Sequence, residues 1–278
     1  MIAIYPAASR HTNNHGWLQS NFSFSFADYY DPNNMNFGPL RVFNDDIVQP
    51  QTGFGAHPHR EMEIVSFVLK GQLQHRDSSG GSSTIGPGEI QRMSAGKGIV
   101  HSEMNPSETE EVNFLQLWFE PNQYGIAPSY EEISYDLDAG INTLVPVVSN
   151  RLHVPEKTAF IHQDLTVYLS RLEASKTISF TQEAGRKIYL FVIEGELQVN
   201  GEHYLMRRDA ARITEATSLN LLAKRETTFM LIDLPWPGKI TLRICEHTSA
   251  GYLYSQNKYP SVSSEGYFFN VSYYITGG

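Results

Sequence analysis

The chain has 278 residues, with 21 lysines and arginines against 30 aspartates and glutamates, and a formal net charge of −9. No segment gathers basic residues into a stripe that could neutralise phosphates, so the composition argues against direct binding of DNA or RNA. The single cysteine, Cys245, excludes an intrachain disulfide and a multi-cysteine zinc or iron–sulfur site. It therefore predicts a cytoplasmic location.

The first residues, 1–8, lack a basic stretch followed by an apolar one, and no apolar run approaches the ~20 residues of a membrane-spanning helix. We therefore expect a soluble protein with no targeting segment and no membrane partner. Charged residues make up 18% of the chain and aromatic residues 12%, a balance that favours half-buried strands over charged surface helices.

Short apolar or alternating runs between turn residues recur along the first half of the chain. Residues 64–69 form a β-branched run, and residues 72–76 alternate before a polar turn at 77–81. A Gly-Pro-Gly turn follows at 86–88, and residues 113–119 form a further strand. Many short strands with turn signals between them predict an all-β fold, a sandwich or a barrel.

A degenerate copy of this pattern lies in the second half. Residues 68–74, Val-Leu-Lys-Gly-Gln-Leu-Gln, resemble residues 192–198, Val-Ile-Glu-Gly-Glu-Leu-Gln, at an offset of 195 − 71 = 124. The repeat predicts two homologous β-barrels. We expect the first in residues 1–135, the second in residues 136–237, and a tail of no assigned role in residues 238–278.

Four candidate metal ligands occur as two pairs in the first half. His57 and His59 are two residues apart, as are His101 and Glu103, and both pairs follow glycines. Alternate residues of a strand project from the same face, so each pair presents its two side chains together. Two adjacent strands of this kind would bring three imidazoles and one carboxylate to one point. The pattern predicts a metal site with room for exogenous ligands.

Nitrogen and carboxylate ligands without a thiolate suit Fe(II), Mn, Ni, Cu or Zn, and such sites with open positions are typical of non-haem iron oxygenases. The alternative interpretation is a set of surface histidines near glycine-rich turns. Two pairs with the same spacing favour the metal site, although a motif needs its structural context.

Other polar residues have a structural interpretation. His75 alternates with Leu73 and is expected to pack or to form hydrogen bonds rather than to bind a metal. Asn44, Asp45 and Asp46 could orient an imidazole, but adjacent aspartates usually mark a solvated turn, and we expect a turn.

The motifs of the first half resemble those of the pirin family, most closely the bacterial pirins that resemble quercetin 2,3-dioxygenases. The resemblance spans nearly the whole first barrel and continues more weakly through the second to residues 231–235. The segments that carry it include Phe24-Ser-Phe-Ala-Asp-Tyr-Tyr-Asp-Pro32, Gly53-Phe-Gly-Ala-His-Pro-His59, Gln91-Arg-Met-Ser-Ala-Gly96 and His101-Ser-Glu103.

The resemblance implies a bicupin, two jelly-roll β-barrels in one chain, with the metal in the N-terminal cupin. Residue by residue, it carries the ligand role to His57, His59, His101 and Glu103. It favours Fe(II), with Zn, Cu, Ni or Mn as alternatives. It also implies a second cupin without metal ligands, and a shift of the first histidine pair by 124 lands on residues 181 and 183, a Thr and a Glu.

The sequence departs from the family pattern in three places. Phe22 stands where related chains usually have a histidine, so no polar role is inherited there. Phe43 replaces a common isoleucine, which changes packing only. Residues after about 237 extend beyond the shorter bacterial relatives, and they inherit no function.

The resemblance implies an oxidoreductase, a metal-dependent dioxygenase that acts on a flavonol or related aromatic and dioxygen. In this hypothesis the metal polarises the substrate oxygens and Glu103, as the catalytic base, takes the hydroxyl proton. The alternative, from the resemblance to pirins that act as transcriptional co-regulators, is an iron-binding regulator that acts through a protein partner, because acidic charge disfavours direct DNA contact. We favour the enzyme because the ligand set is intact.

Overall fold

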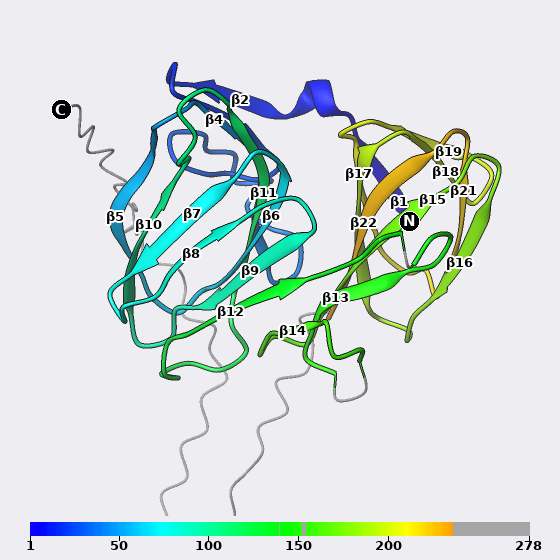
Figure 1. Ribbon diagram of the computed structural model, residues 1–278. Helices are drawn as coiled ribbons and strands as arrows, with labels where there is room; N and C mark the ends of the chain where they lie inside the picture. The colour runs from blue at the N-terminus through cyan, green and yellow to red at the C-terminus, as the bar shows by residue number, and fades with distance from the viewer. Residues whose placement is uncertain (139, 152–153, 236–278) are drawn as a thin grey trace, which may run out of the picture.

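The computed structural model describes residues 1–138, 140–151 and 154–235, which form 22 strands and one 3-10 turn, η1 (Ala7–Ser9). The strands build two barrels that lie side by side (Figure 1). The prediction of an all-β bicupin is confirmed. The tail of residues 238–278 lies outside the described residues. Within the described ranges, no helix has the length and apolar character of a membrane span.

The first barrel combines a seven-stranded sheet, in the order β12-β9-β6-β11-β4-β3-β2, with a four-stranded sheet, β5-β10-β7-β8. Its strand-to-strand pairs are antiparallel, as expected for short strands joined by tight turns. The strands are β2 (His11–Asn14), β3 (Leu18–Phe22), β4 (Leu40–Val48), β5 (Gly53–His59), β6 (Glu63–Lys70), β7 (Leu73–Asp77), β8 (Ser82–Ile85), β9 (Glu89–Ser94), β10 (Ile99–Met104), β11 (Val112–Phe119) and β12 (Ser129–Ser134).

The second barrel has the same plan, with a seven-stranded sheet β1-β20-β17-β22-β15-β13-β14 and a four-stranded sheet β16-β21-β18-β19. Its strands are β13 (Val145–Ser149), β14 (Ala159–Phe160), β15 (Thr166–Leu172), β16 (Thr177–Thr181), β17 (Lys187–Glu194), β18 (Glu196–Val199), β19 (His203–Met206), β20 (Ala210–Ile213), β21 (Ser218–Ala223) and β22 (Thr227–Leu234). The repeated segments 68–74 and 192–198 therefore occupy matching places, at the β6–β7 and β17–β18 turns.

The N-terminal segment belongs to both barrels. β1 (Ile2–Tyr5) pairs with β20 of the second barrel, whereas β2 pairs with β3 of the first. The intervening residues, which include η1, run from one barrel to the other (Figure 1). The division of the chain near residue 135 stays a prediction, and β1 is one segment of the first range that pairs outside the first barrel.

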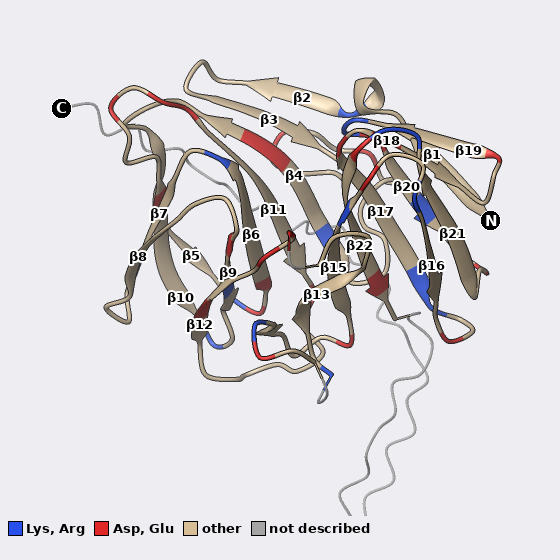
Figure 2. Cartoon of the chain, turned by 45° about the vertical axis from the view of Figure 1, so that its right-hand side comes forward, with Lys and Arg blue, Asp and Glu red and all other residues tan. Residues whose placement is uncertain are grey.

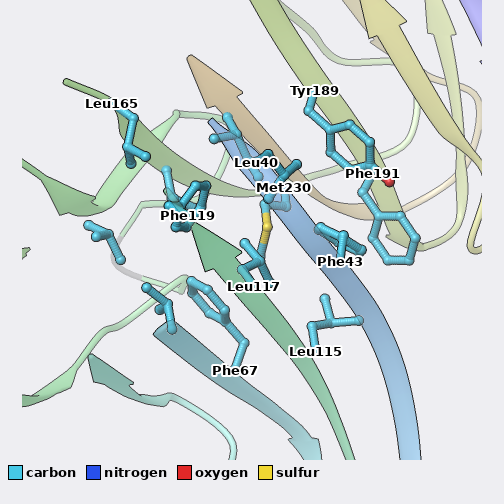
Figure 3. Close-up of a cluster of buried hydrophobic side chains, with 14 of the residues drawn as sticks. Leu40, Phe43, Phe67, Leu115, Leu117, Phe119, Leu165, Tyr189, Phe191 and Met230 are labelled. Atoms are coloured by element: carbon cyan, nitrogen blue, oxygen red, sulfur yellow. The ribbon is translucent and has the colours of Figure 1, made fainter. Parts of the chain in front are cut away.

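The two seven-stranded sheets pack against each other through a shared apolar core (Figure 3). Phe43 of β4 is fully buried, and its ring centroid lies 4.9 Å from that of Tyr189 and 4.7 Å from that of Phe191, both on β17. Leu115 and Leu117 of β11 join the same core. Because strand residues alternate between faces, Gln116 and Trp118 of β11 point instead into the first barrel.

The expected turn at Asn44, Asp45 and Asp46 is wrong, because these residues form the middle of β4 (Figure 2). All three are buried. Asp46 accepts a hydrogen bond from Ser20, and Asp45 accepts one from Asn113 at 2.9 Å. Burial raises the pKa of Asp46 to about 8; the Ser20 hydrogen bond partly opposes this, and the nearby charges of Asp45 and Glu103 add to it. Buried partners, rather than water, satisfy these carboxyl groups.

The inter-barrel core makes a stability prediction. Phe43→Ala should lower the free energy of unfolding by about 3–5 kcal/mol, because it leaves a cavity where three aromatic rings meet. Urea denaturation of both proteins measures the difference. Tyr124→Ala, at a side chain that is 72% exposed, is the control and should change stability by no more than about 0.5 kcal/mol. Equal effects of the two substitutions would contradict this account of the interface.

Candidate metal centre

Three of the four predicted ligands lie together inside the first barrel. β5 and β10 pair antiparallel, and His57 lies opposite His101. The ring centroids of His57, His59 and His101 are separated by 4.5 to 4.8 Å. One nitrogen from each ring lies within 4.8 Å of those of the other two. The structure thus joins the two sequence pairs through the pairing of their strands.

Alternation along β10 explains the inward direction of its ligands. Ile99, His101 and Glu103 are buried, whereas Val100 between them is 41% exposed. Every second side chain of a strand points to the same face, so His101 and Glu103 necessarily share the barrel interior. The spacing of two residues was therefore a sound signal for this strand.

A β-bulge in β5 shifts the register in which β5 pairs with β10. The partner of His101 is His57, but the partner of Glu103 is Phe54, so β5 contains an extra residue in this interval. Bulges of this kind redirect side chains next to functional sites. Gly53 closes the irregular stretch, and a Cβ atom at this position would lie 2.3 Å from the carbonyl oxygen of Glu103. Glycine is required there because the two backbones approach too closely for a side chain.

Burial keeps the inner histidines uncharged. Burial, followed by the proximity of His57, lowers the pKa of His59 to about 3. Burial also lowers the pKa of His101 far below its usual range, with further contributions from His57, His59 and His75. A neutral imidazole has one N–H and one lone pair, and the lone pair is what a metal ion binds.

Hydrogen bonds to Nδ1 orient the free nitrogens of two of these rings. His57 Nδ1 lies 2.7 Å from the carbonyl oxygen of Gly55. A carbonyl oxygen only accepts, so His57 Nδ1 carries a proton, and Nε2 is the nitrogen through which this ring could bind a metal ion. His101 Nδ1 lies 3.3 Å from His75 Nδ1. His101 Nε2 is buried and has no hydrogen-bond partner in the described part of the chain.

A chain of hydrogen bonds behind His101 determines which of its nitrogens is protonated. Burial alone would raise the pKa of Asp77, but hydrogen bonds from Ser79, His75 and Gly81 lower it to about 2, so this carboxylate is charged and only accepts. His75 Nε2 donates to Asp77 Oδ2 at 3.1 Å. In its neutral form, His75 then has its lone pair on Nδ1 and accepts a hydrogen bond from the Nδ1–H group of His101. The lone pair of His101 is left on Nε2.

Glu103 lies beside this cluster and is held by amide groups. Glu103 forms a second group with His75 and His101, and the candidate ligand atoms of these three residues lie within 4.8 Å of one another. His57 and His59 do not belong to this second group. Gln91 Nε2 donates to its Oε1 at 2.7 Å, and Gln116 Nε2 donates to its Oε2 at 2.6 Å. The carboxylate therefore touches the histidine cluster through His101.

The orientation of both amides is determined by their neighbours. The hydroxyl group of Tyr130 donates to Gln91 Oε1 at 3.2 Å, and Trp118 Nε1 donates to Gln116 Oε1 at 3.1 Å. Each amide oxygen is thus occupied, and each amide NH₂ group faces Glu103. These two amide donors and the Ser66 hydroxyl, at 3.4 Å from Oε1, converge on a carboxylate that is 2% exposed.

These residues fit a metal ion. Three imidazoles converge, the two inner ones, His59 and His101, are uncharged, and His101 Nε2 is a buried acceptor without a partner in the described part of the chain. A buried polar atom without a partner is rare and calls for an explanation such as an ion. Histidine nitrogens with a nearby carboxylate oxygen suit first-row divalent metals. The ligand roles of His57, His59, His101 and Glu103 stay predictions that this geometry supports.

Sequence reasoning missed Gln91 and Gln116 and the orienting role of His75. His75 was expected to pack or to form hydrogen bonds, and it does both, since it also stacks on Tyr130 at a centroid distance of 4.4 Å. The available signal for Gln116 was a polar residue flanked on both sides by apolar ones in residues 114–119. A buried polar side chain needs a partner, so such a residue points to an interior polar group.

The second barrel has apolar residues where the first has ligands. In the first barrel, Glu103 lies opposite His75, and the equivalent pair of the second barrel is Leu221 and Val199. His101 lies opposite His57, and the equivalent pair is Leu219 and Phe180. None of these four side chains of the second barrel offers a ligand atom, and all four belong to an apolar core. β16 also lacks the bulge of β5. The position in the second barrel that is equivalent to His57 is therefore Phe180, and not residue 181, which the offset of 124 predicts.

Comparisons with known proteins agree with this arrangement. The pirin family model matches residues 6–119, and a model described as the quercetinase C-terminal cupin domain matches residues 147–234. A protein of Escherichia coli strain K12 named quercetin 2,3-dioxygenase is 37% identical over 235 residues, which cover 84% of this chain and 99% of the relative. A pirin-like protein of Caulobacter vibrioides is 37% identical over 79% of this chain and 93% of its own length.

The structure is also similar to a solved one. The bacterial pirin YhhW of Escherichia coli in complex with nickel(II) superposes with a TM-score of 0.80 at 37% identity, over 85% of this chain and 100% of that one. Family models match both barrels, and curated relatives match over most of the length of each chain. The chain is a member of the pirin family.

Proposed function

We propose that the protein is a metal-dependent dioxygenase of the quercetinase type, which acts on a flavonol or a related ortho-oxygenated aromatic together with dioxygen. The observation that carries this proposal is the histidine cluster in which His59 and His101 are buried and uncharged and His101 Nε2 has no partner among the described residues. The name quercetin 2,3-dioxygenase of relatives that match 84% of the chain supports the choice of reaction. The cytoplasmic location is part of the proposal and rests on the single cysteine.

His57, His59 and His101 would hold the metal, with Glu103 as a fourth ligand. We propose Fe(II) because neutral histidines and a carboxylate are its typical ligands in oxygenases. Zn, Cu, Ni and Mn suit the same donors, and the affinity order of divalent metals favours Cu and Zn in vitro. A bound divalent metal supplies Lewis acidity that polarises the oxygens of a bound substrate. Metal analysis of protein purified without a chelating column would identify the native ion.

Glu103 would accept the hydroxyl proton of the substrate. Each of its oxygens already accepts one amide hydrogen bond and keeps further lone-pair capacity. Since Gln91 and Gln116 are themselves held by Tyr130 and Trp118, the carboxylate has little freedom to rotate. A positioned base of this kind requires no reorganisation before it takes the proton.

Trp118 and the exposed edge of β5 would contribute to substrate access. The Trp118 ring meets the His59 ring edge to face at a centroid distance of 4.7 Å. β5 is the edge strand of its sheet, and its residues Gly55, Ala56 and Pro58 are exposed. We place the entrance for a planar aromatic molecule beside this edge.

Aerobic incubation with quercetin tests the proposed reaction directly. Iron-loaded protein should decrease the flavonol absorbance and release carbon monoxide, and chelated protein should do neither. Absence of turnover with any of several divalent metals would contradict the enzymatic proposal.

The histidine ligands make the first prediction about metal binding. His57→Ala and His101→Ala should each abolish stoichiometric metal binding but keep the β-fold, because each barrel has its own apolar core and does not depend on the ion. Metal content and circular dichroism measure the two properties. An unfolded variant would instead indicate a structural metal.

The carboxylate makes a second prediction. Glu103→Gln should keep partial metal occupancy but lose about 10²–10⁴ in rate, since an amide can offer an oxygen to the metal but cannot take the proton. Occupancy should be partial because the new NH₂ group faces the NH₂ group of Gln91 or Gln116. Equal losses of metal and rate would reduce Glu103 to a ligand, and full activity would place the base elsewhere.

The hydrogen-bond chain behind His101 makes a third prediction. In Asp77→Asn the amide oxygen should stay at the Oδ1 position, where Ser79 and Gly81 donate, so the NH₂ group faces His75. His75 must then accept at Nε2 and donate from Nδ1, which moves the proton of His101 to Nε2. Metal affinity should fall about 10–100-fold.

Titration calorimetry with Ni(II) or Zn(II) measures this affinity. Asp138→Asn, at an exposed side chain, is the matched control and should bind like the wild type. Unchanged affinity in Asp77→Asn would show that the chain does not determine which nitrogen of His101 is protonated.

A further inference from the structure

A small cavity of about 30 Å³ lies between the two barrels and shares no lining residue with the metal centre. Its walls come from the crossing N-terminal segment and from both barrels, through Arg10, Ser23, Tyr189 and Arg212 among others. A space of this size holds one or two water molecules or one monatomic ion.

Arg212 is a buried cation that lacks a counter-ion in the described part of the chain. It is 9% exposed, and its guanidinium carbon lies 4.0 Å from the ring centroid of Tyr5 and 4.3 Å from that of Phe24. Its Nη2 donates to the carbonyl oxygen of Ser23 at 2.9 Å and to Asn34 Oδ1 at 2.7 Å, both neutral acceptors. Its Nε is buried without a partner. A buried charge of this kind is costly unless it is compensated.

Several other groups that line the cavity are hydrogen-bond donors without a hydrogen bond among the described residues. They are Arg10 Nε, the Ser23 hydroxyl and the Tyr189 hydroxyl, together with Arg10 Nη1, which has only a long ion pair with Asp45. Burial raises the pKa of Tyr189, while Ser23, Arg212 and Arg10 partly oppose the shift, so the group keeps its proton at neutral pH. Arg10 Nε and Arg212 Nε are both unpaired guanidinium N–H groups, which cannot accept.

The charges around the cavity do not balance. Arg10 and Arg208 share one buried carboxylate, Asp45, at 3.7 and 3.6 Å. The other acidic partner of Arg208 is Glu194, whose side chain is 54% exposed. With Arg212 added, this region holds three buried arginine side chains, and Asp45 is the one buried carboxylate that pairs with any of them in the described part of the chain. Water could accept the donated hydrogen bonds but would leave this positive charge uncompensated.

We propose that the cavity binds one small monovalent anion of the size of chloride, held by Arg10, Arg212 and the Tyr189 hydroxyl. The ion accepts the unpaired N–H and O–H donors and neutralises Arg212. Because the donors come from β17, β20 and the segment that follows η1, occupancy stabilises the attachment of the N-terminal crossing to both barrels. A chloride-dependent stability is the expected consequence.

Thermal unfolding in sodium chloride and in sodium gluconate at equal ionic strength tests the proposal, because gluconate is too large for a cavity of about 30 Å³. Chloride should raise the Tm of the wild type by about 3 °C relative to gluconate. Arg212→Met and the milder Tyr189→Phe should reduce this difference. Arg225→Met removes an exposed arginine of the same barrel and should keep it, which corrects for general salt effects. An identical difference in all four proteins, or none in the wild type, would overturn the proposal.

Crystals grown in sodium bromide give an independent test. An anomalous peak between Arg10 and Arg212 that is absent in Arg212→Met supports the anion. A cavity that contains only water in the wild type, or a bromide peak in a protein whose Tm does not respond to chloride, would contradict a site that is occupied in solution.

Discussion

An imidazole buried inside a β-barrel loses its charge and still needs a partner for each ring nitrogen, and the interior of the first barrel is organised around this requirement. Gly55, His75 and Asp77 satisfy the nitrogens that point away from the cluster. The nitrogen that points into the cluster, His101 Nε2, is left without a partner in the described part of the chain. The same requirement applies to Glu103, whose two oxygens are matched by two amides that cannot turn around. Around the histidine cluster, the hydrogen bonds thus leave a lone acceptor at the place where an ion fits.

The second barrel has the same strand order but no buried imidazoles at the positions equivalent to the candidate ligands. Its strands have the same order, but Phe180, Leu219 and Leu221 occupy the positions of the ligands and pack into one apolar core. Dispersion and the hydrophobic effect then hold the barrel, and no interior hydrogen-bond network is needed. The first barrel holds the candidate metal centre, and the second packs against it through the shared apolar core.

Because side chains alternate along a β-strand, the same strands line both the candidate metal centre and the apolar interface between the barrels. On β11, Gln116 and Trp118 face the site, while Leu115 and Leu117 face the second barrel. On β4, Asp46 faces the first barrel, while Phe43 and Asp45 face the second. A shift of either strand by one residue would expose polar groups to the apolar interface and remove the amide support of Glu103. The interface and the site therefore depend on the same strand register.

The sequence alone determined the class of fold, the repeat and the ligand candidates, because these depend on local pattern: alternation, turn residues and a spacing of two. It failed at Asn44, Asp45 and Asp46, where three polar residues in a row resemble a turn but lie within β4. Arginines far away in the sequence pair with Asp45, and Ser20 donates to Asp46. The sequence also equated His57 with residue 181 rather than Phe180, because a bulge changes the register and an offset does not show it. Tertiary structure decided three further features. They are the hydrogen bonds from Gln91 and Gln116 to Glu103, the position of the proton on His101, and the arginine N–H groups without hydrogen bonds between the barrels. Each of these depends on which strands become neighbours, and long-range pairing leaves no periodic signal in the chain.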